Sequence, residues 1–438
     1  MKGKFCGLAV LAAIGAAGPA CAWEQFVGAA PNFVHNLAPE GALSVNANGD
    51  VCLLSNDRVY GQVQFAHIFT FDANGGAARP TLSIGHPSGL TTFGVDCRFG
   101  PPVIGVRWTE YAQRNVELVS YSDDRMSTWP LDFWPIGAAS VTRFGAASGQ
   151  VPVVLREKPH GAAFAVEAYA PPPSPPMPVW GVNLANGAAP GLEVSDFAVA
   201  ADASSVLMGV YDNPSYESEA LFIQHLDAQG QNTFATSIVG DPSHPEIGPT
   251  AISPGGFAYY VRRGNPFIDD ELWRIDAAGG PPQWMPVSFG TPALVLKLVT
   301  LADNGALVLS QDTYGVGFLS IARYAADGSL LWRSMPGEIQ APRTVLDLIG
   351  DRAGRVLVVS VDPAPQLPGS RLIELNGFDA QGYSAWGRSV LNARFDEGNP
   401  VALALTSDDR AVIAVHASDS YGTPGILVQS FTLDSSGP

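Results

Sequence analysis

The residues of this chain best suited to recognition are tyrosines that stand beside aspartates in connecting segments. Tyr211 precedes Asp212, and Tyr314 and Tyr421 each follow an aspartate by two positions. A tyrosine ring offers flat apolar area, and neighbouring carboxylate oxygens orient a ligand. The candidate ligand-binding residues are Tyr211, Tyr216, Asp269, Tyr314 and Tyr421. The alternative is ordinary surface polarity, which explains the aspartates better than it explains the recurring tyrosines.

The sequence contains no nucleophile elbow, no His-x-x-x-His pair and no Cys-x-x-Cys motif. Its seven histidines are scattered singly, and a lone histidine is more often structural than catalytic. The run Asp269-Asp270-Glu271 offers carboxylates to a hard cation such as calcium, but it lacks the spaced ligands of a calcium loop. A solvated acidic tip is the preferred interpretation, so no catalytic residue, metal or cofactor is predicted.

A repeat positions these side chains. Eight short turns, most of them rich in aspartate and glycine, each follow a strand-like run, and neighbouring turns are 48 to 56 residues apart. A period this regular indicates one supersecondary unit repeated along the chain. The turns lie at residues 72–75, 123–124, 171–172, 227–230, 276–279, 327–328, 379–382 and 434–437. A tryptophan follows most of them at what is predicted to be one shared position: Trp129, Trp180, Trp284, Trp332 and Trp386.

A second turn lies about midway between neighbouring anchors, again eight times. Short runs rich in β-branched residues, such as 306–310 and 355–360, flank these turns and predict strands. Each unit therefore has four antiparallel strands, lettered A to D, in roughly 40–50 residues, the size of a propeller blade. The predicted fold is all-β, a single eight-bladed β-propeller. Stacked β-sandwiches are the alternative, which the two repeated turn signals disfavour.

The eighth unit lacks a D strand after its turn at Asp434. The segment Trp23–Gly28 resembles Trp332–Gly337 but follows no turn of its own. It is therefore predicted to supply the missing strand by pairing with the strand around Ile426–Leu433. Such pairing closes the propeller and removes an exposed sheet edge. The alternative is a disordered N-terminal tail that happens to contain a tryptophan.

Residues 1–22 have the features of a secretory signal peptide: a basic start, a short apolar core and the small-residue cleavage site Ala20-Cys21-Ala22. The alternative is a lipoprotein anchored at Cys21. Residues 23–438 are predicted to form one propeller domain that is exported to the periplasm or the extracellular space. No other segment is long and apolar enough to cross a membrane.

The formal net charge of the chain is −17, which argues against partners recognised through phosphate contacts, such as nucleic acid or anionic lipid. The protein is predicted to be a monomer. Beyond the leader, the chain has two cysteines, Cys52 on strand B of the first unit and Cys97 at the end of strand A of the second. Export favours a Cys52–Cys97 disulfide if the Cα atoms lie about 4.4–6.8 Å apart. Two buried free thiols are the alternative.

The turn with its tryptophan, as in Asp327-Gly328-Ser329-Leu330-Leu331-Trp332, resembles the repeat of the quinoprotein-dehydrogenase-like (PQQ-like repeat) eight-bladed propellers. The resemblance covers nearly all of residues 23–438 and implies the fold, with the tryptophan packed between blades. That superfamily includes quinone-dependent alcohol dehydrogenases and a non-enzymatic outer-membrane assembly lipoprotein. Its dehydrogenases have adjacent cysteines near the quinone and acidic calcium ligands. This chain has no adjacent cysteines, and none of its residues matches a calcium ligand of the family.

In a propeller, the B–C and D–A loops share one face and the tight A–B and C–D turns share the other. The candidate tyrosines and Asp269 belong to the longer B–C loops, and binding residues concentrate on loops held by a rigid scaffold. The preferred interpretation is an exported, non-enzymatic binding or scaffold propeller that recognises a protein or glycan through the B–C loop face. The alternative is a quinoprotein-type oxidoreductase that uses the central channel.

Overall fold

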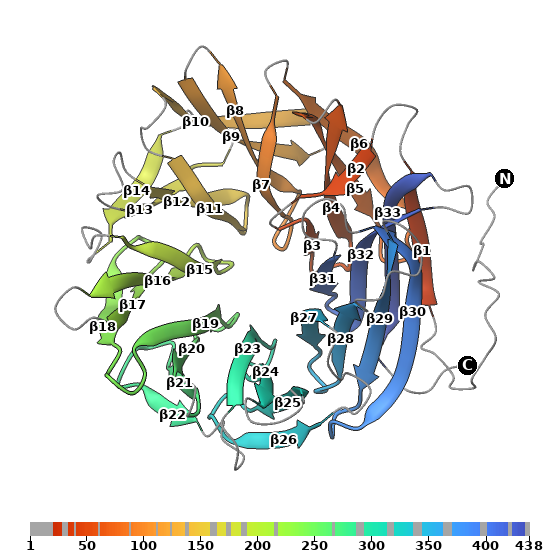
Figure 1. Ribbon diagram of the computed structural model, residues 1–438. Coiled ribbons are helices and arrows are strands. Elements are labelled where there is room, and N and C mark those ends of the chain that lie inside the picture. The colour runs from red at the N-terminus through yellow and green to blue at the C-terminus, as the bar shows by residue number, and fades with distance from the viewer. Residues whose placement is uncertain are drawn as a thin grey trace. The chain divides into compact units, whose positions relative to one another are not determined.

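The computed structural model describes residues 21–28, 34–38, 41–59, 62–86, 89–110, 113–122, 125–135, 140–157, 164–171, 177–184, 191–213, 218–264, 268–285, 293–312, 319–335, 344–361, 370–394, 401–418 and 423–433. These residues form 33 β-strands and no α-helix (Figure 1). The strands assemble into eight antiparallel sheets. This confirms the all-β prediction and the eight-bladed β-propeller class. Within the described part of the chain, no helix has the length and apolar character needed to span a membrane.

The chain divides into two compact units, residues 1–98 with 342–438, and residues 99–341. We call each sheet a blade, numbered in chain order. In the first unit, blade 1 contains β2 (Val34–Leu37), β3 (Leu43–Val45), β4 (Val51–Val59), β5 (Gln62–Phe71) and β6 (Ala77–Gly85). Blade 7 contains β27 (Thr344–Gly350), β28 (Val356–Val361), β29 (Ser370–Phe378) and β30 (Ser384–Arg394). Blade 8 contains β31 (Val401–Leu405), β32 (Arg410–Ser418), β33 (Pro424–Thr432) and β1 (Cys21–Gly28). Strand β7 (Thr91–Asp96) also lies in this unit and begins blade 2.

The second unit begins with the other strands of blade 2, which are β8 (Val103–Glu110), β9 (Gln113–Ser122) and β10 (Arg125–Pro135). Blade 3 contains β11 (Ser140–Ala147), β12 (Val151–Glu157), β13 (Phe164–Tyr169) and β14 (Pro178–Asn183). Blade 4 contains β15 (Glu193–Val199), β16 (Ser205–Asn213), β17 (Ser218–Leu226) and β18 (Asn232–Val239). Blade 5 contains β19 (Glu246–Ile252), β20 (Ala258–Arg263), β21 (Glu271–Ile275) and β22 (Gln283–Met285). Blade 6 contains β23 (Ala293–Thr300), β24 (Ala306–Asp312), β25 (Leu319–Tyr324) and β26 (Leu330–Ser334).

The N-terminal strand completes the last blade, as the sequence predicted. Strand β1 runs antiparallel beside β33 in Figure 1, with Trp23 opposite Ser430 and Gly28 opposite Gly425. The same blade also contacts blade 1, because the N–H of Leu37 donates to His416 Nε2 at 2.7 Å. Segments nearly 400 residues apart in sequence are thus joined within one unit. The signal-peptide prediction concerns residues 1–22, of which 1–20 lie outside the described residues, and it stays a prediction.

Apolar side chains fill the spaces between successive blades. One buried cluster contains Leu155 of blade 3 and Phe222 of blade 4, and another contains Ile223 of blade 4 and Tyr260 of blade 5. The A strands of blades 3 to 6 each contain a register shift, such as that between Val295 and Lys297. A β-bulge leaves backbone groups without a ladder partner, so other groups must satisfy them.

A tryptophan on the D strand of one blade can pack against the C–D turn of the next blade. A Cβ added to Gly230, in the turn of blade 4, would lie 2.5 Å from the Trp180 ring of blade 3. Trp180 Nε1 donates to the carbonyl of Ala228 in that turn at 3.0 Å. A Cβ on Gly75 of blade 1 would likewise meet Trp23 of blade 8 at 2.7 Å. These two tryptophans therefore pack between blades, as the resemblance implied.

Trp284 does not share this role. Its side chain is 55% exposed, and the next residue, Met285, lies against Gly328 of blade 6. The alternation of side chains along a strand explains the difference, because neighbouring residues point to opposite faces. The prediction that Trp284 occupies the same position as Trp180 is wrong by one residue.

The close approach of ring and turn predicts a difference between two glycines. Gly230 (φ +77°) and Gly149 (φ +73°) both have left-handed backbones, but no atom lies within 4 Å of a Cβ added to Gly149. Replacing Gly149 with alanine should therefore cost about 1 kcal/mol of backbone strain. Replacing Gly230 with alanine should cost about 1–3 kcal/mol more, because the indole must also move. Urea unfolding of the two variants measures the difference, and equal losses of stability would contradict the packing described.

Candidate functional site

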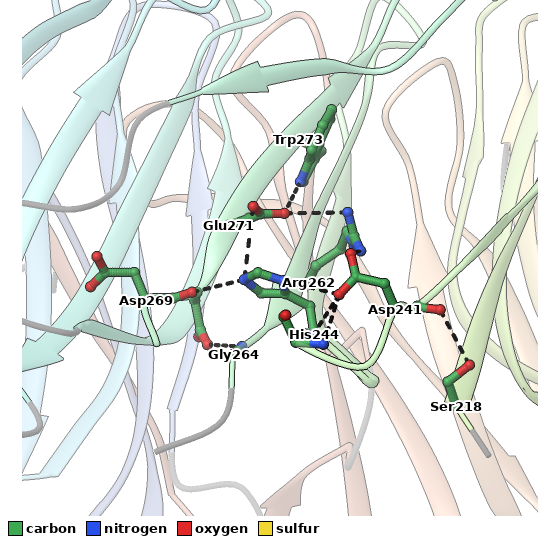
Figure 2. Close-up of polar contacts among 11 residues, drawn as sticks. Ser218, Asp241, His244, Arg262, Gly264, Asp269, Glu271 and Trp273 are labelled. Carbon is green, nitrogen blue, oxygen red and sulfur yellow. Dashed lines mark hydrogen bonds and ion pairs between the residues drawn. The ribbon is translucent and has the colours of Figure 1, made fainter. Parts of the chain in front are cut away.

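A polar cluster joins the D–A loop before blade 5 to strands β20 and β21 (Figure 2). Asp241 and His244 come from that loop, Arg262 from the end of β20, and Glu271 and Trp273 from β21. We call these five residues the blade-5 cluster. They lie at the end of the blade from which the D–A and B–C loops emerge, which is the face predicted to bind a partner.

The loop that carries Asp241 and His244 is fixed by its own sequence. The Asp241 carboxylate accepts the N–H groups of Ser243 at 2.9 Å and His244 at 3.0 Å, the local bonding that favours aspartate in turns. Pro242 and Pro245 restrict the backbone on either side. A Cβ on Gly240 would lie 2.7 Å from the carbonyl oxygen of His244, so only glycine fits there. The loop therefore presents the two side chains in one defined conformation.

Arg262 is held from both sides. Its Nη2 pairs with Asp241, its Nη1 lies 3.3 Å from Glu271 Oε2, and its guanidinium lies 5.8 Å from the centre of the Trp273 ring. The indole Nε1 of Trp273 also donates to Glu271 Oε2 at 3.0 Å. Only 13% of the Arg262 side chain is exposed, against 49% of the Asp241 side chain. The arrangement is a preorganised arginine on an aromatic ring, with a half-exposed carboxylate beside it.

His244 lies beneath this pair, with its side chain buried. Its Nε2 is 3.2 Å from the carbonyl oxygen of Asp269 and 3.8 Å from Glu271 Oε1, while its Nδ1 is 3.5 Å from Asp241 Oδ1. Desolvation opposes ionisation of Asp241, but hydrogen bonds from Arg262 and from the loop backbone outweigh it and lower the pKa of that carboxyl. Asp241 is therefore a carboxylate at neutral pH.

Asp269 and Asp270 prove to connect blades. Asp269 Oδ1 accepts the N–H of Ala293 at 2.9 Å, at the start of blade 6. Asp270 Oδ1 accepts the N–H of Gly264 at 3.1 Å, and its Oδ2 accepts that of Val295 at 2.8 Å. Val295 stands at the bulge of β23, so Asp270 satisfies an N–H that the bulge leaves without a ladder partner. Burial raises the pKa of Asp270, and these two N–H donors partly offset the rise.

Blade 4 also has an acidic side chain that accepts an N–H from the bulged A strand of the next blade. Glu219, on β17, accepts the N–H of Ile247 at 2.6 Å, and Ile247 stands at the register shift of β19. An acidic residue at or just before the start of one C strand thus pairs with the bulged A strand of the next blade. The interpretation of residues 269–271 as a solvated acidic tip is therefore wrong for Asp270, which is buried and bonded. Within the described residues, no group of three His, Cys, Asp or Glu side chains is placed to hold a metal ion.

The five predicted binding residues have different outcomes. Asp269 lies next to the blade-5 cluster, since its carbonyl accepts from His244, but its carboxylate is used by Ala293. Tyr211 lies in strand β16 rather than in the predicted B–C loop, and it is half-buried against the apolar cluster between blades 3 and 4. Tyr216, Tyr314 and Tyr421 lie outside the described residues, so their assignment stays a prediction.

Sequence analysis missed most of the cluster. His244 is one of seven histidines scattered singly in the sequence, and Arg262 and Trp273 belong to no motif that the sequence shows. The available signal was Asp241-Pro242-Ser243-His244, a turn sequence in a D–A loop, whereas the candidates came from B–C loops alone. The D–A loops emerge on the same face as the B–C loops, so they can supply part of a site on that face.

The opposite end of the blades uses its aspartates differently. Asp72, Asp227 and Asp379 each accept two N–H groups from their own turns, at 2.7–2.9 Å. Such local bonds stabilise a tight turn. The turn aspartates thus serve their own hairpins, while the blade-5 cluster gathers side chains from three separate elements.

Comparison with known proteins supports the fold and leaves the role open. No family model matches the chain, and no curated protein matches its sequence. An oligogalacturonate lyase from Vibrio parahaemolyticus matches with a TM-score of 0.50 and 9% identity, over 93% of this chain and 96% of its own. Sqt1 from Chaetomium thermophilum matches with a TM-score of 0.50 and 11% identity, over 93% and 100%. A puromycin hydrolase matches with a TM-score of 0.50 and 14% identity, over 87% of this chain and 59% of its own.

Identities this low show the fold alone. The neighbours include a lyase and a hydrolase beside Sqt1, so they assign no activity to this chain. The propeller fold that the quinoprotein resemblance implied is confirmed. Membership of that superfamily stays a prediction.

Proposed function

We propose that the protein is an exported, non-enzymatic binding or scaffold propeller that recognises a protein or glycan partner through its B–C and D–A loop face. The observation that carries this proposal is the blade-5 cluster, in which Arg262 is fixed between Asp241 and Glu271 and stacked on Trp273. Arginine and tryptophan are enriched among the residues that dominate binding energy at interfaces. Because the side chains are already ordered, little conformational entropy is lost when a partner binds.

The negative charge of the protein favours some partner surfaces over others. The chain carries a formal charge of −17, and the blade-5 cluster adds two carboxylates against one arginine. Complementary potentials favour neutral or basic partner surfaces and disfavour polyanions. Export to the periplasm or the extracellular space, which the leader predicts, would place such a partner in the same compartment.

The alternative function, a quinoprotein oxidoreductase, requires acidic calcium ligands and a quinone site. Asp269 and Asp270 are bonded to backbone N–H groups and Glu271 to Arg262, so these carboxylates are already used within the fold. Within the described residues, no group of three His, Cys, Asp or Glu side chains could hold calcium. Incubation with pyrroloquinoline quinone and calcium, followed by a dye-reduction assay on alcohols and sugars, distinguishes the two functions: turnover would replace the binding proposal.

A substitution in the cluster tests the proposal. A cross-linking pull-down with the mature protein, together with a glycan array, identifies the partner. Replacing Asp241 with asparagine retains a turn-forming side chain but removes the exposed charge, and it should weaken binding at least about tenfold, equivalent to about 1.4 kcal/mol. Thermal unfolding of the variant checks that the fold is kept.

Turn-side substitutions are the matched controls. Replacing the exposed Gln229, Asn74 or Gln381 with alanine should leave the affinity unchanged, because these side chains lie at the C–D turns. If these variants lose binding while the Asp241 variant keeps it, the functional face has been assigned wrongly.

A further inference from the structure

The two cysteines of the first unit are brought together by one serine. Ser44, on β3, lies opposite Cys52 of β4 in the sheet register. The N–H of Cys97, just after β7, donates to Ser44 Oγ at 3.0 Å. Cys52 and Cys97 thus both lie against the same serine, and both are free thiols in the structure. A disulfide between two cysteines requires their Cα atoms to lie about 4.4–6.8 Å apart.

Both thiols are sealed from solvent. Each cysteine is 1% exposed. Burial raises the pKa of the Cys52 thiol well above its ordinary value, and the hydrogen bond with Cys97 adds to the rise. Thiol–disulfide exchange requires a thiolate that can reach a sulfur of the reagent. The folded protein therefore disfavours the Cys52 thiolate and gives a reagent no access to either sulfur.

We propose that Cys52 and Cys97 form a disulfide during folding after export, and that the completed fold then protects it from exchange. This inference is independent of the binding function. In the reaction, the thiolate of one cysteine attacks the disulfide of a thiol–disulfide oxidoreductase or of oxidised glutathione and forms a mixed disulfide. The second cysteine displaces the reagent's other sulfur. The two protein thiols lose two electrons and two protons, and the reagent disulfide is reduced to two thiols.

The bond would join β4 to the end of β7 and enclose the strands between them. The enclosed loop contains about 45 residues, and closure of a loop of this size in the unfolded chain favours the folded state substantially. Strand β3 has only three residues, and its Ser44 contacts both cysteines. The disulfide would therefore hold blade 1 against the first strand of blade 2.

The test compares folding in oxidising and reducing buffers, and it uses residues 23–438, whose two cysteines are Cys52 and Cys97. One sample is refolded from urea in a glutathione redox buffer and another with excess dithiothreitol. Each is then denatured in the presence of an alkylating reagent and weighed as an intact protein. The oxidising sample should carry no alkyl group on Cys52 or Cys97, whereas the reduced sample should carry one on each.

Protection is measured by exchanging the buffers after folding. The sample folded in the glutathione buffer, once moved to dithiothreitol, should keep its disulfide for hours, while the same oxidised chain in urea should be reduced within minutes. The oxidised sample should unfold at a temperature roughly 5 °C higher than the reduced one. Free thiols after oxidative refolding would overturn the disulfide. Equal reduction rates for the folded and unfolded oxidised chains would overturn protection of the disulfide by the fold. The assay uses the natural chain, so no outcome depends on whether a cysteine variant folds.

Discussion

A chain that lacks residues 23–28 should lose at least about 5 kcal/mol of stability, because β1 supplies both a strand and buried apolar groups. Trp23 and Val27 are buried, and truncation of a buried tryptophan alone typically costs about 3–5 kcal/mol. The deletion also removes the ladder between β1 and β33 and exposes the edge of β33. Differential scanning calorimetry of the deleted chain, with its leader retained, measures the effect.

Single substitutions at Gln25 and Trp23 distinguish the exposed side of β1 from its buried side. Gln25 lies in the middle of β1 with an exposed side chain, so its replacement by alanine should change the melting temperature little. Trp23 instead packs on Phe71 of blade 1, with ring centres 5.8 Å apart, and its replacement by alanine should reproduce much of the loss. An unchanged melting temperature after the deletion would show that the strand does not close blade 8.

Replacing Asp270 with alanine should destabilise the Phe99–Ala341 unit by about 3 kcal/mol. The change leaves the N–H groups of Val295 and Gly264 without their acceptor, and an unsatisfied buried donor costs about 1–3 kcal/mol. Asparagine at this position retains one acceptor oxygen, so it should cost about half as much. Denaturant unfolding gives the stabilities, and hydrogen exchange at the Val295 amide reports directly on the lost bond.

Asp227 is the matched control for this prediction. Its carboxylate also accepts two N–H groups, from Gln229 and Gln231, but these bonds lie at the exposed turn of blade 4. Water can replace the lost acceptor there, so alanine at this position should cost less than alanine at Asp270. Equal losses would show that Asp270 is not a connection between blades.

The sequence contained enough to predict the fold because its signals are local and repeated. Turns such as Asp227–Gly230 require left-handed glycine and a capping aspartate, and both are visible in one sequence. The closing strand could be found because Trp23 begins a segment that matches the D strand at Trp332. Repetition turns weak single signals into a strong one.

The candidate site could not be predicted in the same way because its contacts are between elements. Asp270 appeared as part of an exposed acidic run, and only the bulge of the following blade shows which N–H it satisfies. Trp284 was misplaced by one residue, because a shift of one residue in a strand exchanges the two faces. The pairing of Arg262 with Asp241 joins strand β20 to the preceding D–A loop, and these two elements approach only in the folded blade.

The central claim is that a partner contacts the loop face of the propeller rather than the turn face. Strand β18 offers a matched pair of positions, since Val239 is exposed at its loop end and Gln229 is exposed in the turn that precedes it. A photo-reactive amino acid is incorporated at one position or the other, and the mature protein is irradiated with its partner. Binding through the loop face should give a covalent adduct from position 239 and none from position 229. An adduct from position 229 alone would contradict it.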